Sequence, residues 1–505
     1  MKRQITLVIV LCSLFVVLLL GYLFVLRPLT RVEEVPEEAP ETEAGEAVGT
    51  GNRFFLFGSL QRSDIAQIEV ENEYGTFAFY QAEEGKFRIR GYDNIPYDEY
   101  KFATLVNVTA YTLSKIKVGT SLTDEKMEEY GLTTPGARWT VTANSGEKFT
   151  VLVGDRLLTG GGYYCMLEGR RSAYVLGTEV ADTILCPIEN YVTPVLVSGV
   201  TQNDYYMVDH FALYANGEQI TGIRRKDRAE QTNPDALAEV MMEYPTAYYP
   251  DTNLYYGVIF SYLNFTADVC VKLGAGEADF AEVGLTEPAH RVAFTHLGTD
   301  YTLDFSERTE DGGYYVRSSL YPNVIGMVDG AALSYLETTL IDWIDPYVFQ
   351  QYITNMETLT VQSEKVDAAF RLEHGVDAEG KALLAVTANG RGIPEEQIAS
   401  FREFYKSLLG VVIQDYAADD EYCPLSEEEL AALAADPAAA YLTFTATSLD
   451  REVMEYRFYE YSTRHSLVTV DGVGEFYVRT DHVKKIENDA ARILAGEEVT
   501  AYEKD

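Results

Sequence analysis

The segment YGLTTPGARWTVT, Tyr130 to Thr142, has a near copy further along the chain, VGLTEPAHRVAFT, Val283 to Thr295. Counted from Gly131 to Gly284, the spacing is 153 residues. In both copies Gly-Leu-Thr-x-Pro stands between a short helical pattern and an alternating apolar run. Glycine suits the left-handed residue that ends a helix, and proline prevents the helix from continuing. The motif therefore predicts a helix end followed by a strand, and its recurrence predicts a repeated domain.

A second pair of related segments has almost the same spacing. GGYYCML at Gly161 corresponds to GGYYVRS at Gly312, 151 residues later. Two matches at nearly equal spacing indicate internal duplication. A third, more diverged unit is expected because Pro437, in an Asp-Pro turn, lies 149 residues after Pro288.

The expected fold is α+β, with three tandem, similar units of about 150 residues, a common size for a domain. Each unit should contain antiparallel strands, one main helix, a short helix and a four-stranded meander. Main helices are expected near Asp98–Leu113 and Pro394–Leu409, where apolar residues recur at helical spacing. Short helices are expected at Asp124–Tyr130, at Glu277–Val283, and from a capping box at Ser426–Glu429. The expected units are 53–198, 199–345 and 346–505.

The N-terminus predicts a membrane anchor. Ile5–Leu26 is a run of 22 residues without a charge, and about 20 apolar residues cross the hydrocarbon core as a helix. No small-x-small cleavage site follows the run, which argues against a cleaved signal peptide. A lipidated cysteine is also disfavoured, because Leu11 occupies the place of the small residue expected before Cys12. We expect residues 1–4 in the cytoplasm, 5–26 as a single-pass signal anchor in the cell membrane, and the bulk of the chain outside.

The charge of the chain limits its partners. There are 40 basic and 79 acidic residues, for a net charge of −39, so nucleic acid and anionic lipid surfaces would repel the protein. An excess of basic residues on one side of a membrane span normally sets its orientation, but here the basic residues on the two sides nearly balance. The expected orientation therefore rests on the acidic character of the large domain, which is consistent with a location outside the membrane. Residues 27–52 are rich in glutamate and proline, which predicts an extended linker.

Several of these features together resemble a known family. They are the anchor, the acidic ectodomain, YGLTTP after a short helix, and the hairpin segments FTVLVGD and YYCMLEGRRSAYVL. The chain resembles the bacterial family catalogued as domain of unknown function 4340 over about Ile65–Leu185, with Val208–Val328 as a weaker second copy. Beyond Met356 the resemblance fades. It implies an envelope protein encoded near ABC-type transporter components of the gliding-motility kind, and it supplies no catalytic residues.

A direct search for catalytic or metal-binding motifs gives little. Gly160-Gly161-Gly162 lacks the Lys-Ser/Thr and the helix of a phosphate loop, so a hairpin turn is the better interpretation. No Gly-x-Ser-x-Gly nucleophile motif occurs. The histidines show no His-x-x-x-His spacing, and the two that flank an expected strand should point apart or to solvent. The six are His210, His290, His296, His374, His465 and His482.

Cysteine and tyrosine leave alternatives open. Cys165 and Cys186 share a unit and are the one pair worth testing for a disulfide, although Cys165, Cys186, Cys270 and Cys423 are more simply read as small buried hydrophobes. The 37 tyrosines can be explained by the ordinary preference of tyrosine for strands. Alternatively, they form protein interfaces or flat surfaces that bind sugars. Adjacent tyrosines in a strand must place one ring on each face.

These observations favour a non-enzymatic, membrane-anchored accessory or scaffold subunit that contacts an ABC-type, gliding-motility-like transporter or another envelope protein. The alternative is a cell-envelope glycan-binding protein or hydrolase that uses a carboxylate pair. We expect no catalytic, cofactor-binding or metal-binding residues, and no nucleic-acid partner.

Overall fold

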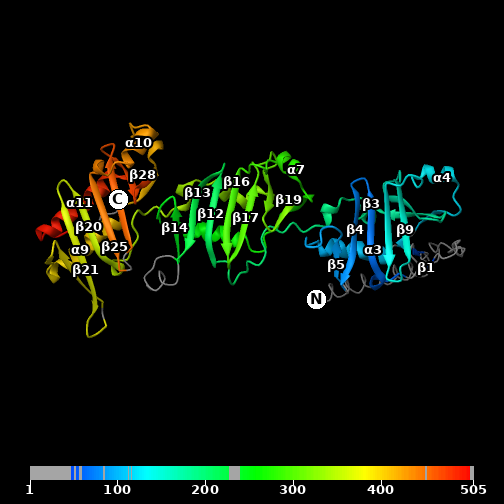
Figure 1. Ribbon diagram of the computed structural model, residues 1–505, viewed down its shortest axis with the longest axis horizontal. Helices are drawn as coiled ribbons and strands as arrows, with labels where there is room; N and C mark the ends of the chain where they lie inside the picture. The colour runs from blue at the N-terminus through cyan, green and yellow to red at the C-terminus, as the bar shows by residue number, and fades with distance from the viewer. Residues whose placement is uncertain are drawn as a thin grey trace, which may run out of the picture. The chain divides into compact units, whose positions relative to one another are not determined.

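The computed structural model describes residues 47–49, 53–55, 60–83, 86–111, 113–114, 116–226, 239–380, 382–449 and 452–500. The fold is α+β, with three large antiparallel sheets that carry helices (Figure 1). Two compact units contain them: Met1–Ile188 holds the first sheet, and Glu189–Asp505 holds the second and third. The expected anchor, 5–26, and most of the expected linker, 27–52, lie outside the described residues. Within the described residues, no helix is long and apolar enough to cross a membrane.

The first sheet has eight strands in the order β5-β4-β3-β8-β9-β10-β11-β7. Its strands are β3 (Ile65–Asn72), β4 (Gly75–Glu83), β5 (Lys86–Ile89), β7 (Lys117–Gly119), β8 (Ala137–Ala143), β9 (Lys148–Arg156), β10 (Gly162–Leu167) and β11 (Ala173–Gly177). Its helices are η2 (Arg62–Asp64), α3 (Glu99–Tyr111), α4 (Asp124–Glu129) and α5 (Thr178–Asp182), and η3 (Ile188–Tyr191) begins at the last residue of this unit. A small separate sheet joins β1 (Ala47–Gly49), β2 (Arg53–Phe55) and β6 (Leu113–Ser114), so strand structure begins inside the segment expected as linker.

The second sheet has the order β14-β13-β12-β16-β17-β18-β19-β15. Its strands are β12 (Val208–Ala215), β13 (Glu218–Arg225), β14 (Val240–Tyr244), β15 (Val269–Leu273), β16 (His290–His296), β17 (Thr299–Phe305), β18 (Gly313–Ser318) and β19 (Tyr321–Asp329). Its helices are α6 (Thr252–Ser261), α7 (Glu277–Glu282), η5 (Gly330–Glu337) and α8 (Leu340–Trp343).

The third sheet has the order β23-β22-β21-β20-β25-β26-β27-β28-β24. Its strands are β20 (Met356–Ser363), β21 (Asp367–Val376), β22 (Ala382–Ala388), β23 (Arg391–Gly392), β24 (Ile413–Tyr416), β25 (Leu442–Ser448), β26 (Val453–Glu460), β27 (His465–Val470) and β28 (Val473–Arg479). Its helices are η6 (Ile353–Asn355), η7 (Glu395–Gln397), α9 (Ile398–Leu409), η8 (Ala417–Asp419), α10 (Glu427–Ala434), η9 (Pro437–Ala439) and α11 (Thr480–Ala495).

The three sheets share one topology. Three strands form one side of each sheet, a main helix follows, and after a short helix a four-stranded meander completes the sheet. The third sheet differs only by the added edge strand β23. The expectation of three tandem α+β units therefore matches the strand order, including that of the most diverged third unit.

The elements missed from the sequence include two kinds that complete the units. One is the short strand between main and short helix (β7, β15 and β24), which pairs with the last meander strand and becomes an edge of each sheet. These strands are three to five residues long, too short for a clear alternation. The other is α11, whose buried residues recur at helical spacing and which packs beside α9.

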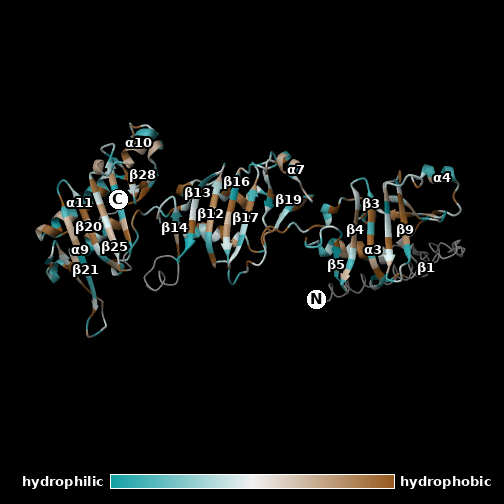
Figure 2. Cartoon of the chain, in the orientation of Figure 1, coloured by the Kyte–Doolittle hydropathy of each residue, from teal (hydrophilic) through white to brown (hydrophobic). Residues whose placement is uncertain are grey.

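Each main helix covers one face of its sheet through aromatic contacts. The ring centroid of Phe102 in α3 lies 4.9 Å from that of Phe79 in β4, and Tyr255 in α6 lies 5.8 Å from Phe211 in β12. In the third sheet Phe404 of α9 lies 5.2 Å from Phe370 of β21. Apolar residues, drawn in brown, recur along the strands of all three sheets (Figure 2). Burial of this face is the main stabilising term.

A smaller apolar cluster under each short helix fills part of the opposite face. In the first sheet it contains Leu132, Leu152 and Met166, and in the second Phe280 and Leu285. The third sheet has Leu430, Tyr459 and Leu467 at the same place. The meander strands are therefore apolar on both faces where the short helix lies above them.

The Gly-Leu-Thr-x-Pro motif ends the short helix as expected. Gly131 and Gly284 have φ of +67° and +73°, in the left-handed region. The N–H groups of the following leucines donate across the turn, from Leu132 to the Met127 carbonyl at 2.8 Å and from Leu285 to the Phe280 carbonyl at 2.8 Å. This is the Schellman arrangement, which usually brings an apolar residue into contact with the helix. Both leucines are buried, so the motif is structural.

Candidate functional site

A groove lies on the second sheet beside the second copy of the motif. Its volume is about 860 Å³, within the usual range of ligand-binding sites. The hairpin turn between β12 and β13 borders it, as does the turn that follows α7, and β12, β16 and β17 contribute the remaining residues. The lining residues are Tyr214, Asn216, Gly217, Thr286, Glu287, Pro288, Arg291, Ala293 and Thr302.

Arg291 is held in this groove by a buried carboxylate. Its Nε donates to Oδ1 of Asp304 at 2.6 Å, and Nη2 of Arg317 donates to Oδ2 of the same carboxylate at 2.6 Å. The Asp304 side chain is 6% exposed, whereas that of Arg291 is 45% exposed. The hydrogen bond to Asp304 raises the pKa of Arg291. Arg317 lies over the ring of Phe280, 4.7 Å from its centroid, and does not line the groove.

The sequence analysis missed this cluster, although the hairpin contains a signal for it. Leu297 and Gly298 both have positive φ and form the two-residue turn between β16 and β17. A two-residue turn fixes the register of the paired strands. Centring the hairpin on that turn places Arg291 opposite Asp304, as observed.

Equivalent positions in the other sheets carry different chemistry. The row of paired residues is Arg138, Leu152 and Met166 in the first sheet, Arg291, Asp304 and Arg317 in the second, and Thr443, Arg457 and Thr469 in the third. The backbone pairing is retained, and each row contains an arginine, but only the row of the second sheet contains a carboxylate. The duplication thus preserved the sheets and not a shared polar site.

A second polar cluster surrounds Asp420 in the third sheet. Its Oδ2 accepts from the Tyr461 hydroxyl at 2.7 Å and contacts Nδ1 of His465 at 2.8 Å, while Oδ1 accepts from the Tyr422 N–H at 3.1 Å. Burial acts to raise the pKa of Asp420, but the hydrogen bonds from Tyr461 and His465 outweigh it, and the pKa is lowered. The His465 ring lies 4.6 Å from that of Tyr477. The cluster fastens the loop before α10 to the start of β27.

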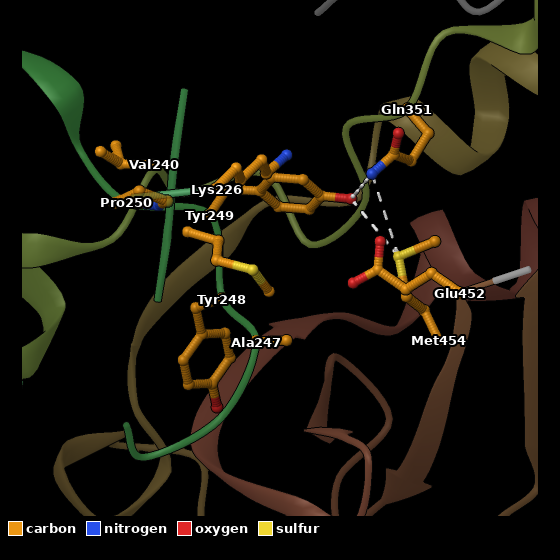
Figure 3. A pocket seen from close by; sticks show the side chains of 10 residues that line it. Lys226, Val240, Ala247, Tyr248, Tyr249, Pro250, Gln351, Glu452 and Met454 are labelled. Atoms are coloured by element: carbon orange, nitrogen blue, oxygen red, sulfur yellow. Dashed lines mark hydrogen bonds between the residues drawn. The ribbon is translucent and has the colours of Figure 1, made fainter. Parts of the chain in front are cut away.

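The junction of the second and third sheets contains a small pocket, of about 40 Å³. The Tyr249 side chain points toward Gln351 and Met454 there, and Tyr248 points away from them (Figure 3). Nε2 of Gln351 donates to the Tyr249 hydroxyl at 3.1 Å, and that hydroxyl lies 3.9 Å from Sδ of Met454. A site of this size is far smaller than a ligand pocket. It lies in the continuous apolar core that the two sheets share. This contact region between the second and third sheets is called the seam.

The histidines are dispersed. The expectation that His290 and His296 point apart or to solvent was wrong: both are buried, at 9% and 3% exposure. Six residues apart in one strand, they share a face, because successive side chains alternate. Burial lowers the pKa of His290. His210 lies 3.2 Å from Glu243, His374 contacts the Met356 carbonyl, and His482 contacts the Gly410 carbonyl. In the described part of the chain, no three His, Cys, Asp or Glu residues are grouped to hold a metal ion.

Cys165, Cys186, Cys270 and Cys423 are free thiols. The pair Cys165–Cys186 is therefore not a disulfide in this structure. Cys165 is buried and the other three are half-buried, and burial raises the pKa of the Cys165 and Cys270 thiols to about 12. A thiol with such a pKa is a weak nucleophile at neutral pH.

The adjacent tyrosines in strands divide between the two faces as expected. Tyr314 lies in the main core of the second sheet and Tyr315 packs on the cluster under α7. In the first sheet Tyr164 stacks on Tyr130 with ring centroids 4.1 Å apart. These rings mostly fill cores rather than form an exposed platform.

The comparison with protein families agrees with the repeated sheets. The family model described as Domain of unknown function (DUF4340) matches residues 87–243 and 267–432, together more than half of the chain. The chain belongs to this family. Each DUF4340 match begins within one repeat and ends within the next, since the first runs from β5 to β14 and the second from before β15 into α10. No curated protein and no solved structure matches the chain.

Proposed function

We propose that this DUF4340 protein is a non-enzymatic, membrane-anchored extracytoplasmic scaffold, an accessory subunit that contacts an ABC-type transporter or another envelope protein. The observation that carries the proposal is the repetition of one sheet topology with unlike side chains at equivalent positions. A scaffold needs several distinct surfaces on a stable frame, whereas an enzyme needs one converging set of groups. The shared core of the second and third sheets adds stiffness to that frame.

The membrane part of the proposal rests on the sequence. The uncharged run Ile5–Leu26 is long enough to anchor the chain. The acidic linker would separate the sheets from the bilayer. The accessory role follows from the transporter association that the family resemblance implies.

Topology and partner contact can be tested together. Protease added to intact protoplasts should remove the region 53–505, and its protection would contradict the external location. A photo-crosslinker at an exposed position such as Tyr352, 51% exposed, should join the full chain to a membrane protein. A chain without residues 1–26 should lose that crosslink while keeping its fold. Retention of both crosslink and function without the anchor would overturn the proposal.

The non-enzymatic part has its own test. Alanine substitution of single His, Cys, Asp and Glu residues of the external region should leave complementation intact wherever folding is intact. Loss of function in a well-folded protein after removal of one carboxylate pair would favour a hydrolase.

One observation favours the glycan-binding alternative. Tyr206 and Phe260 are 41% and 48% exposed, and the Tyr205 ring lies 5.3 Å from that of Phe260. Exposed aromatic rings can bind sugar faces. Binding of soluble cell-wall glycan fragments that Tyr206→Ala abolishes would support this alternative over the scaffold.

A further inference from the structure

We propose that the groove on the second sheet is a binding site for a carboxylate group, and that Arg291 recognises it. The proposal does not depend on the scaffold function, because it concerns one groove within one sheet. It rests on the fixed position of Arg291, on its unused donors, and on the shape of the groove.

The first step is the orientation of the guanidinium group. Asp304 accepts a hydrogen bond from Arg291 only through Nε. No described residue accepts a hydrogen bond from Nη1 or Nη2 of Arg291. Arg317 fixes the same carboxylate from its other side. The guanidinium group of Arg291 is therefore held in position before a ligand binds, which reduces the entropy lost on binding.

The second step is the charge. Two guanidinium groups share one carboxylate, so the cluster has an excess positive charge in a chain whose net charge is −39. Arginine binds carboxylates through two parallel hydrogen bonds, and such bonds are about twice as strong as neutral ones. Glu287 also lines the groove and opposes anions. A ligand with a single carboxylate fits this balance better than a polyanion does.

The third step is the shape. Ala293 and Thr302 are small residues that pair on neighbouring strands, and both line the groove. Tyr214, Asn216 and Thr286 contribute a phenol, an amide and a hydroxyl to the lining. The groove is much larger than a carboxylate alone, so the ligand is expected to have a body with amide or hydroxyl groups. A peptide carboxylate, at the C-terminus or on an acidic side chain, has this chemistry.

The test is calorimetric titration of the full chain in detergent with three probes. They are acetyl-Ala-Ala with a free carboxylate, the same compound with an amide cap, and acetyl-Ala-Glu-amide. We expect the capped compound not to bind and the others to bind with Kd on the order of 1 mM, the strength of a single anchored group. Preference for the first or the third compound identifies a main-chain or a side-chain carboxylate.

Two arginine variants form a matched pair, because both residues bind Asp304 and only Arg291 lines the groove. Arg291→Gln should weaken binding at least about tenfold, the value of hydrogen bonds to a charged group. Arg317→Gln should weaken binding by a smaller factor, because Arg317 fixes Asp304 but does not line the groove. Ala293→Leu should weaken binding by narrowing the groove without changing the charge, and Glu287→Gln should strengthen it. Unfolding midpoints confirm that each variant is folded.

Three results would overturn the proposal. They are binding of the capped compound as tightly as the free acid, unchanged affinity in a folded Arg291→Gln or Ala293→Leu variant, and equal loss in both arginine variants. The last result would mean that Asp304 supports the fold and that the groove does not recognise the ligand.

Discussion

The N–H of Leu132 donates to the carbonyl oxygen of Met127 at 2.8 Å, across the end of the short helix α4. The bond forms because Gly131, between them, adopts a φ of +67°. The second sheet repeats the arrangement at Gly284, with a φ of +73°. Two glycines with the same backbone role but different surroundings give a direct test of the motif.

Replacing either glycine with alanine should destabilise its sheet. An L-residue in the left-handed conformation costs about 1 kcal/mol. For Gly284→Ala that is the whole expected loss, because the nearest atom to the new Cβ is Ser306 Cβ at 3.9 Å. In Gly131→Ala the Cβ would lie 2.6 Å from Oδ1 of Asp155, so the loss should be larger. Thermal unfolding measures both, and an equal or smaller loss at Gly131 would contradict this account.

Gly154, in the FTVLVGD segment, should tolerate no side chain. A Cβ at this position would lie 2.1 Å from the carbonyl oxygen of Tyr130, which accepts from the Asp155 N–H at 2.9 Å. Gly154→Ala should therefore separate α4 from β9 and lower the free energy of unfolding by about 1–3 kcal/mol, as overpacking does. Gly161→Ala is the control, since no atom lies within 4 Å of its Cβ. Comparable unfolding midpoints for the two variants would refute the steric explanation.

The Asp420 cluster should make stability depend on pH in the acidic range. The pKa of Asp420 is lowered in the folded state, and that of an unfolded aspartate is about 3.9. The carboxylate therefore stabilises the fold above about pH 4, and this contribution is lost as pH falls through the lower folded pKa. Asp420→Asn should cost about 2 kcal/mol at neutral pH, because hydrogen bonds to a charged group are removed.

The measurement for Asp420 is the difference in unfolding free energy between wild type and Asp420→Asn at several pH values. It should shrink as the pH falls below about pH 4. The other carboxylates are present in both proteins, so their contribution cancels. A difference that grows as the pH falls would reverse the assigned sign.

The seam between the second and third sheets should hold them in one cooperative unit. The Tyr248 ring lies 5.5 Å from that of Phe476, and the Thr246 hydroxyl donates to the Val470 carbonyl at 3.1 Å. Tyr248→Ala should cost about 3 kcal/mol, as for a buried aromatic ring, and should separate the unfolding of the two sheets. Calorimetry would show a separate transition for each of these two sheets in place of one shared transition, beside the unfolding of the first compact unit. Tyr352→Ala, at an exposed position, should leave the shared transition intact.

Much of the fold could be predicted from the sequence, because residues close in the chain determine where many of its elements begin and end. The short helices α4 and α7 begin and end within a residue of expectation, since a helix-ending glycine follows each of them, and α10 begins at the expected capping box. Ser426 illustrates this: its N–H donates to the Glu429 carboxylate at 2.9 Å, the capping box that the sequence predicts. The strands β7, β15 and β24 could not be predicted from the sequence, because each forms only by pairing with a meander strand that is distant in the chain.

The sequence by itself determined the repeat, the α+β class, the helix ends at Gly131 and Gly284, and membership of the DUF4340 family. These properties depend on spacing and on backbone preferences within a few residues. Only the tertiary structure brought Arg317 onto Asp304, and His465 onto Asp420. Those contacts join residues from separate strands and loops, and in a chain with 79 acidic residues no sequence pattern distinguishes the few carboxylates that folding buries. Burial and register select them, and both follow from how the sheets pair and pack.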